Sequence, residues 1–175
     1  RIKLKKEKHN ISLEDISYKS KNANFIIQQI DLNEKFLIKK FDKINMTFID
    51  DRKIENDLNV IRKKKQYFIS AKSFSIDNII EESLTSNNNK GIFDNSKKIF
   101  NLKIKKAYID DEHDLLDLDG KFEILKNDVV KLDLKSNFNN NKSVSLSIKT
   151  SNNTKVITFN SELAKPFVKK FEFIK

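Results

Sequence analysis

The densest group of side chains that could do chemistry is the run Asp110-Asp111-Glu112-His113-Asp114. Several carboxylates and an imidazole so close together could form a loop that binds a divalent metal ion. The run lacks the glycine and the alternate-position spacing of a calcium loop. It also falls between two strand-like segments, where a charged turn is expected. The sequence therefore predicts a hairpin turn here, with no metal site and no cofactor.

Candidates for acid–base catalysis are limited to His9 and His113, the only two histidines. Neither has a nucleophile in a recognisable frame, such as a Gly-x-Ser-x-Gly elbow. The chain has only two glycines and no glycine-rich phosphate loop, and its lack of cysteine excludes disulfides and thiolate metal sites. We therefore expect no catalytic residues and a protein that is not an enzyme.

The net charge of +10 suggests nucleic-acid binding as one function class. The lysines are, however, spread along the chain with Asp and Glu between them, and the densest cluster, Arg62 to Lys65, sits between two strand-like runs. Most of the 14 phenylalanines alternate with polar residues, which favours an apolar lining over base stacking. We expect a solvated basic surface and no nucleic-acid partner. A general attraction to acidic membranes stays open.

The elements that must position any site are mainly strands. Apolar and polar residues alternate in four runs between Ile99 and Asn160, and a period of two predicts strands with one apolar face. The runs are Phe100–Ile104, Leu116–Ile124, Val130–Phe138 and Val144–Ile148. Turn-forming residues at Lys126-Asn127-Asp128 and Asn139 to Lys142 separate them. Such short links predict a long antiparallel meander that forms a curved, one-sided sheet.

The first part of the chain shows the same pattern in shorter segments. Strands are predicted at 11–18, 24–30, 36–38, 44–48, 58–60 and 67–71. We expect three sections: a strand series with a short terminal helix at 1–84, an Asn/Ser-rich mobile loop at 85–97, and the meander with its own helix at 98–175. Both ends of the chain alternate like strands, which is typical of a piece of a longer protein.

Two short amphipathic helices are predicted beside the strands. Apolar residues at 76, 79, 80 and 84 follow helical spacing after Ser75, a plausible N-cap. The second helix has Leu163, Phe167 and Phe171 on one face and ends near Lys170. Pro166 must lie near its first turn, because proline breaks a helix interior.

The order of these elements over 66–84 and 99–174 resembles the AsmA-like family of bacterial envelope proteins, in particular its YhdP- and TamB-type members. The segments that carry the resemblance are Ile69-Ser-Ala-Lys-Ser-Phe-Ser-Ile-Asp-Asn-Ile-Ile, Phe100-Asn-Leu-Lys-Ile-Lys-Lys-Ala, Leu118-Asp-Gly-Lys-Phe-Glu-Ile, Val130-Lys-Leu-Asp-Leu-Lys-Ser, Val144-Ser-Leu-Ser-Ile-Lys and Thr158-Phe-Asn-Ser-Glu-Leu-Ala-Lys-Pro-Phe-Val. The chain departs from the family at Lys165-Pro166, where a glycine and another small residue are more usual.

The resemblance implies a hydrophobic groove that carries phospholipids between the inner and outer membranes of Gram-negative cells, and so a part in outer-membrane homeostasis. It implies a periplasmic location, with an inner-membrane anchor and membrane contacts in parts of the parent protein beyond this chain. Phospholipid acyl chains would be the partner. The candidate lining residues are Leu118, Phe122, Ile124, Val130, Leu132, Leu134, Val144, Leu146 and Ile148.

Ordinary core packing is the alternative for each of these residues. The alternative for the whole chain is a β-sandwich that serves as a structural or protein-interaction domain and has no lipid role. Two facing sheets, with no open apolar face, would distinguish the sandwich from the groove.

Overall fold

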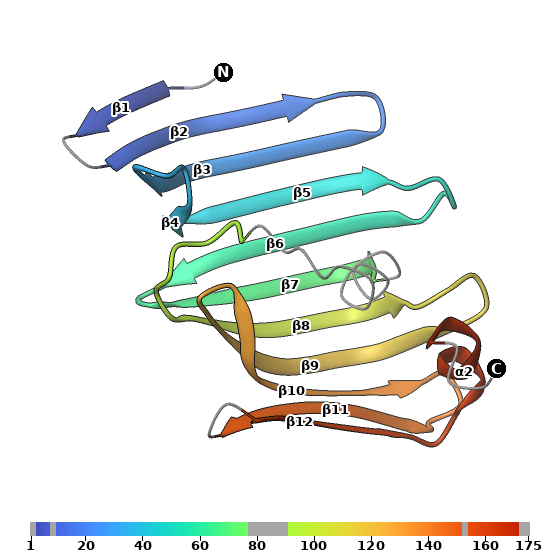
Figure 1. Cartoon of the computed structure of the whole chain (residues 1–175). Coiled ribbons are helices and arrows are strands. Elements are labelled where there is room, and N and C mark those ends of the chain that lie inside the picture. The colour runs from blue at the N-terminus through green and yellow to red at the C-terminus, as the bar shows by residue number, and fades with distance from the viewer. Residues whose placement is uncertain (1–2, 8–9, 77–90, 152–153, 172–175) are drawn as a thin grey trace.

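The computed structural model describes residues 3–7, 10–76, 91–151 and 154–171. Figure 1 shows one large sheet with a short helix near the C-terminal end. The strands are β1 (Lys3–Glu7), β2 (Asn10–Lys19), β3 (Ala23–Asn33), β4 (Ile38–Phe41), β5 (Lys43–Ile49), β6 (Glu55–Lys63), β7 (Gln66–Ser75), β8 (Lys98–Tyr108), β9 (Asp114–Leu125), β10 (Asp128–Phe138), β11 (Ser143–Ser151) and β12 (Thr154–Ser161). The helix is α2 (Lys165–Phe171).

Strand order follows chain order from β1 to β12, except that β4 pairs with β3 outside this path. The mainly β fold with a curved, one-sided sheet is thus confirmed, and the described residues form a single sheet, not the two facing sheets of a sandwich. The predicted antiparallel meander over 98–175 is confirmed, and one parallel pair, β7 with β8, joins it to the strands that precede it. Two adjacent parallel strands need a connection that runs back from the end of the first strand to the side of the sheet where that strand began.

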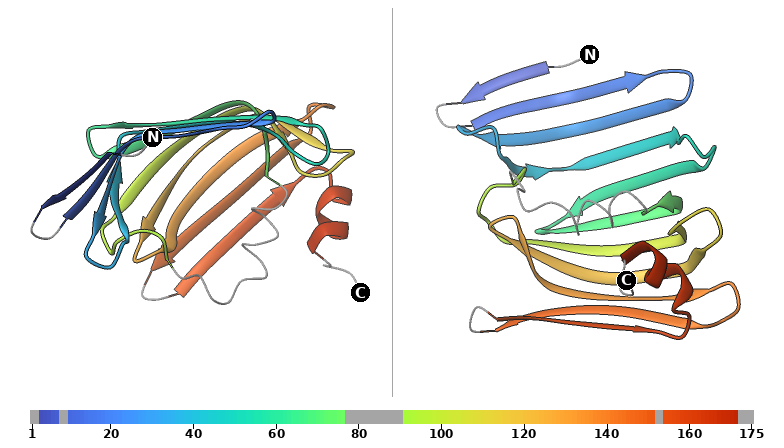
Figure 2. Two further views of the ribbon diagram at one scale, coloured as in Figure 1. Left: turned by 90° about the horizontal axis from the view of Figure 1, so that it is seen from above. Right: turned by 45° about the vertical axis from the view of Figure 1, so that its right-hand side comes forward.

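The sheet is strongly curved, and α2 lies on its concave side (Figure 2). Two strands carry a left-handed residue in mid-strand, Asp15 with φ 53° and Asp117 with φ 51°. The left-handed Asp117 changes which neighbours face inward, so Leu115 and Leu118 are buried three residues apart. The strict alternation predicted for Leu116 to Ile124 was therefore wrong at its start, because Leu115 takes the position expected for Leu116.

The predicted turns are confirmed, and non-glycine residues make them. Lys64, Lys126, Asn127 and Asn141 have φ between 52° and 63°. Two consecutive left-handed residues at Lys126-Asn127 are what a two-residue hairpin turn requires. The run from Asp110 to His113 lies between β8 and β9, as predicted.

The two helix predictions had different outcomes. Helix α2 begins at Lys165, and Pro166 is its second residue, so the C-terminal prediction is confirmed. Ser75, the predicted N-cap of the other helix, ends strand β7, where its backbone N–H bonds Asn56 Oδ1 at 2.7 Å. The rest of that predicted helix, residues 77–84, lies outside the described residues, as do residues 85–90 of the predicted mobile loop.

Candidate functional site: an apolar face on the concave side

A single row of apolar residues crosses the concave face, one residue from each of ten strands. Each member is paired in register with the next, so the row runs perpendicular to the strands. We call it the apolar row, and it consists of Ile16, Ile27, Ile44, Val60, Ile69, Leu102, Gly120, Leu134, Leu146 and Phe159. Nine of its ten members are apolar side chains, and the tenth is a glycine. The face is thus apolar from β2 to β12 without a charged interruption along this line.

Gly120 is the one member of the apolar row that has no side chain. A Cβ atom at this position would lie 2.3 Å from Leu134 Cδ2 and 2.4 Å from the carbonyl oxygen of Asp133. The side chain of Leu134 therefore lies over Gly120 and closes the space that the missing side chain would leave. The apolar surface is therefore continuous from β8 to β10, because the Leu134 side chain fills the space beside Gly120.

A second row follows beside the first and is partly aromatic. It contains Tyr67, Phe100, Phe122, Leu132, Ile148 and Ile157, paired across β7 to β12. The rings of Phe41, Tyr67, Phe100 and Phe122 form a ladder with successive centroids 4.5, 4.9 and 4.7 Å apart. Burial raises the pKa of Tyr67, while a hydrogen bond with the Phe41 backbone acts in the opposite direction. The phenol therefore stays neutral in this apolar setting.

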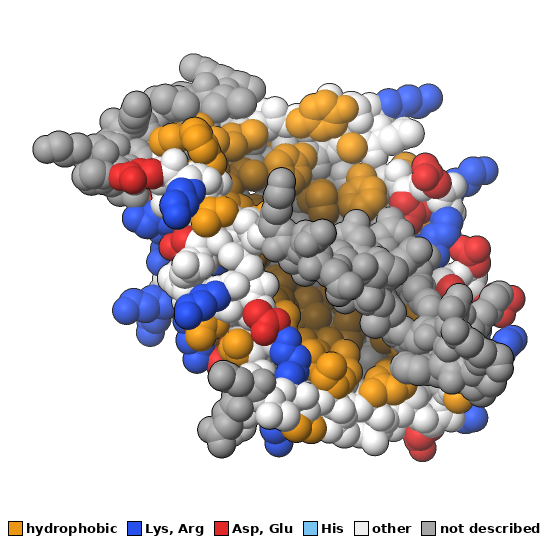
Figure 3. Space-filling model, viewed as in Figure 1, with side chains coloured by type: hydrophobic (Ala, Val, Ile, Leu, Met, Phe, Trp, Pro, Cys, Tyr) orange, Lys and Arg blue, Asp and Glu red, His pale blue; other side chains and the backbone are white. Residues whose placement is uncertain are grey.

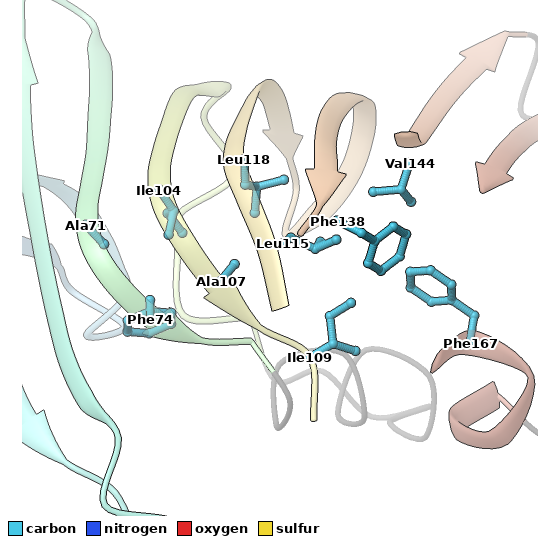
Figure 4. Packing of buried hydrophobic residues seen from close by; sticks show 10 residues of the cluster. All are labelled: Ala71, Phe74, Ile104, Ala107, Ile109, Leu115, Leu118, Phe138, Val144 and Phe167. Carbon is cyan, nitrogen blue, oxygen red and sulfur yellow. The ribbon is translucent and has the colours of Figure 1, made fainter. Parts of the chain in front are cut away.

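The nine predicted lining residues divide into two groups. Leu118 and Val144 are 6% and 7% exposed and pack in a cluster with Phe138 and Phe167 of α2 (Figure 4). The Phe138 and Phe167 ring centroids are 6.0 Å apart, and Phe159 lies 4.7 Å from Phe167. For Leu118 and Val144, core packing within this cluster is the better description.

The other seven predicted residues are partly exposed. Phe122, Leu132, Leu134, Leu146 and Ile148 lie in the two rows, Ile124 packs against the aromatic ladder, and Val130 lies at a register shift between β9 and β10. Exposure increases toward the edge strand β12, where Phe159 is 39% and Ile157 61% exposed. Figure 3 shows this face hollowed, with hydrophobic side chains on its floor and charged ones around it.

Sequence reasoning missed the part of the face that comes from the first strands. Ile16, Ile27, Ile44 and Val60 continue the apolar row beyond β7. Their strands were predicted, but their alignment depends on the register between strands, which alternation alone does not give. The signal available in the sequence was that each strand offers at least one β-branched residue at its centre.

One buried charge borders the apolar face. The ammonium of Lys98 is 2% exposed and donates to Asp94 and, at 2.7 Å, to Ser96 Oγ. Burial acts to raise the pKa of Asp94, but hydrogen bonds from Lys98 and Ser96 outweigh it and hold the pKa below 3.8. The pair fixes residues 94–96 against the start of β8. At this border of the apolar face, the buried charges are therefore paired and hydrogen-bonded.

The carboxylates of the acidic run in the β8–β9 turn bind neighbouring groups of the protein. The Asp110 carboxylate accepts from the backbone of Glu112 at 2.8 Å and of His113 at 2.7 Å, and it lies 2.9 Å from His113 Nδ1. Asp111 pairs with Arg52 at 3.3 Å, and Asp114 pairs with Lys106 at 2.5 Å. Within the described ranges, no group of three or more His, Asp or Glu side chains is placed to hold a metal ion.

No protein-family model, curated protein or solved structure matches this chain. In the parts of the chain that the structure describes, no helix has both the length and the apolar character needed to cross a bilayer.

Proposed function

We propose that this chain is a segment of an AsmA-like envelope protein whose concave face holds the acyl chains of phospholipids. The observation that carries the proposal is the apolar row, which crosses ten strands and becomes more exposed toward β12. A domain that needed only a core would cover these side chains, because exposed apolar area costs about 25 cal/mol per Å². A long apolar row whose side chains stay partly exposed on most strands is useful to a protein that shields hydrocarbon from water.

The dimensions of the apolar row suit a lipid. Adjacent strands lie about 4.8 Å apart, so ten strands span roughly 40 Å. The hydrocarbon core of a bilayer is about 30 Å thick and contains two layers of acyl chains. The row is therefore longer than one acyl chain, and a lipid could move from one set of strands to the next without leaving apolar surface.

The proposed mechanism is passive. Acyl chains contact the row by hydrophobic burial, which is non-directional and needs no particular residue at each step. Headgroups stay in water beside the strand ends. The protein turns nothing over, works in the periplasm, and reaches the membranes through other parts of the parent protein.

Photocrosslinking tests the proposal on the two faces of one strand. Leu146 lies in the apolar row, whereas Ser145 pairs with Lys135 and Asn160 on the opposite face. A photoreactive phenylalanine analogue at position 146 should form adducts with phospholipid in cells or with added vesicles. The same analogue at position 145 should form few. Equal labelling at both positions, or none at 146, would contradict the lipid-groove proposal.

A further inference from the structure

One rim of the sheet is built as a connected surface. We call it the strap rim, and it consists of the β3–β4 turn, the β6–β7 turn, residues 91–97 and the β9–β10 turn. Residues 92–94 bond to β4 on one side, through Ile38 N–H to Ile92 O at 2.8 Å and Asp94 N–H to Ile38 O at 2.9 Å. On the other side, the Asn127 side chain bonds both backbone groups of Phe93, at 2.8 and 2.9 Å. The turns are thus held next to one another.

The β6–β7 turn joins the same rim through its neighbours. Gln66 at the start of β7 pairs with Ile99 at the start of β8, directly after Lys98. The Gln66 side chain also accepts a hydrogen bond from Asn101 at 3.0 Å. In Figure 1 these turns lie at one end of the strands, opposite the β8–β9 and β10–β11 turns.

Large apolar side chains point into solvent along the strap rim. Phe36 is 69% exposed, Ile92 is 62% exposed and Leu125 is 38% exposed. Phe36 also has φ of 60°, a left-handed conformation that is unfavourable for a bulky residue. An exposed phenylalanine at a strained position weakens the fold, and a side chain that is 69% exposed gains little from burial to offset that loss. Its presence is explained if the ring is buried against a partner.

The strap rim is also basic. Lys35 and Lys126 stand beside the exposed apolar residues, and the β6–β7 turn, Lys64-Lys65, belongs to a run of four consecutive cations, Arg62 to Lys65. The opposite rim has the acidic run of the β8–β9 turn and Asp50-Asp51 in the β5–β6 turn. Lysines interleaved with exposed phenylalanine and aliphatic residues are typical of surfaces that lie in the interface of an anionic bilayer.

We propose that the strap rim docks this chain onto the surface of a membrane rich in anionic phospholipids. Phe36 and Ile92 enter the interface, while Lys35, Lys64, Lys65 and Lys126 contact the headgroup phosphates. This docking goes beyond the proposed lipid groove and does not depend on it, because it uses the strand ends and not the concave face. The sequence left a general attraction to acidic membranes open but did not indicate which surface would make the contact.

Vesicle sedimentation tests the docking with residues 1–175. The protein should sediment with phosphatidylcholine vesicles that contain phosphatidylglycerol and much less with phosphatidylcholine alone. Raising the salt from about 0.1 M to about 1 M shortens the Debye length from about 10 Å to about 3 Å and should release most of the protein. Phe36→Gly, which also removes the backbone strain, should weaken the partition about tenfold without loss of folding.

Matched variants test whether vesicle binding depends on the strap rim or on positive charge anywhere on the protein. Lys64→Glu with Lys65→Glu should weaken the partition about tenfold or more. Lys19→Glu with Lys21→Glu, on the opposite rim, should change it little, as should Tyr18→Ser, which removes another exposed aromatic. Equal losses in the two lysine pairs, binding to neutral vesicles alone, or no binding would each overturn the docking. Phe36→Gly should leave photocrosslinking at position 146 unchanged, so the two proposals can fail separately.

Discussion

One aspartate in a left-handed conformation, Asp117, decides which residues at the start of β9 face the concave side. Asp117 has φ of 51°, and the buried residues Leu115 and Leu118 lie on either side of it. A left-handed conformation costs most L-residues about 1–2 kcal/mol, and aspartate and asparagine least among the non-glycine residues. The position of this break therefore depends on a side chain that tolerates it.

Replacing Asp117 with a β-branched residue should weaken the fold. We expect Asp117→Val to lower the free energy of unfolding by about 1–2 kcal/mol, because valine opposes positive φ. Urea denaturation measures the change. Asp117→Asn should be close to wild type, since asparagine also accepts this conformation. If the two variants were equally stable, the left-handed residue would not control the break.

The Asp94–Lys98 pair should make stability depend on pH. The folded-state pKa of Asp94 lies below 3.8, so its carboxylate stabilises the fold above about pH 4. That contribution is lost as the pH falls through the folded-state value. In urea denaturation between pH 6 and pH 3, as a rough range, wild type should lose more stability than Asp94→Asn. A variant that kept the full acid dependence would show that other carboxylates account for it.

Removing one partner of this pair should be more harmful than removing both. Asp94→Asn leaves Lys98 buried without its counter-charge and should cost about 2–3 kcal/mol at neutral pH, somewhat less than a fully buried pair. Lys98→Met with Asp94→Asn should recover at least half of the loss, because methionine fits an apolar site. Equal losses in the single and the double variant would mean that the charge is not the cause.

At the scale of elements, helix α2 acts as a cap on one end of the concave face. Phe167 is 6% exposed and contacts the rings of Phe138 and Phe159. Phe167→Ala should therefore cost about 3–4 kcal/mol and expose the cluster of β8 to β11. The exposed pair Lys165–Glu112, 3.5 Å apart, gives the matched control. Lys165→Ala should change stability by less than about 1 kcal/mol.

Calorimetry and dye binding test whether α2 stabilises the cluster that it contacts. Loss of the helix contact should lower the melting temperature and increase the fluorescence of a dye that binds apolar surface. Phe167→Ala with wild-type stability would show that the cluster is held together by the sheet alone.

The strands could be predicted from the sequence, because alternation records one buried and one solvated face. The break at Asp117, the parallel pairing of β7 with β8 and the strap at residues 91–97 could not. The pairing and the strap depend on interactions between segments far apart in the chain, such as Asn127 with Phe93 or Asn56 with Ser75. An isolated asparagine in a sequence gives no sign of such a partner.

The candidate site shows the same division. Leu134 and Leu146 were predicted as lining, and the structure places both in the apolar row. Leu118 and Val144 were predicted on the same grounds but are buried in the cluster that Phe167 of α2 joins. Alternation identifies an inward-facing residue, but only the packing of other elements determines whether that residue is covered.

At the scale of the whole molecule, the sheet offers two chemically different surfaces. The concave face has the apolar row (Figure 3), and the strand ends have the strap rim on one side and the turns with Asp50-Asp51 and Asp110 to Glu112 on the other. An acyl chain on the face and headgroups beside the strand ends would meet surfaces of matching character. The central claim is that the apolar row binds phospholipid.

Native mass spectrometry of the gently purified protein tests this claim most directly. We expect bound phospholipid on wild type and on Ser145→Asp, which places a charge on the polar face. Leu146→Asp should lose it, because a carboxylate in the apolar row would have to be desolvated by an acyl chain. Phe159→Asp, at a partly exposed edge position, should lose it with little effect on folding, which circular dichroism checks. Folded wild-type protein without lipid, or lipid retained in both apolar-row variants, would contradict the account.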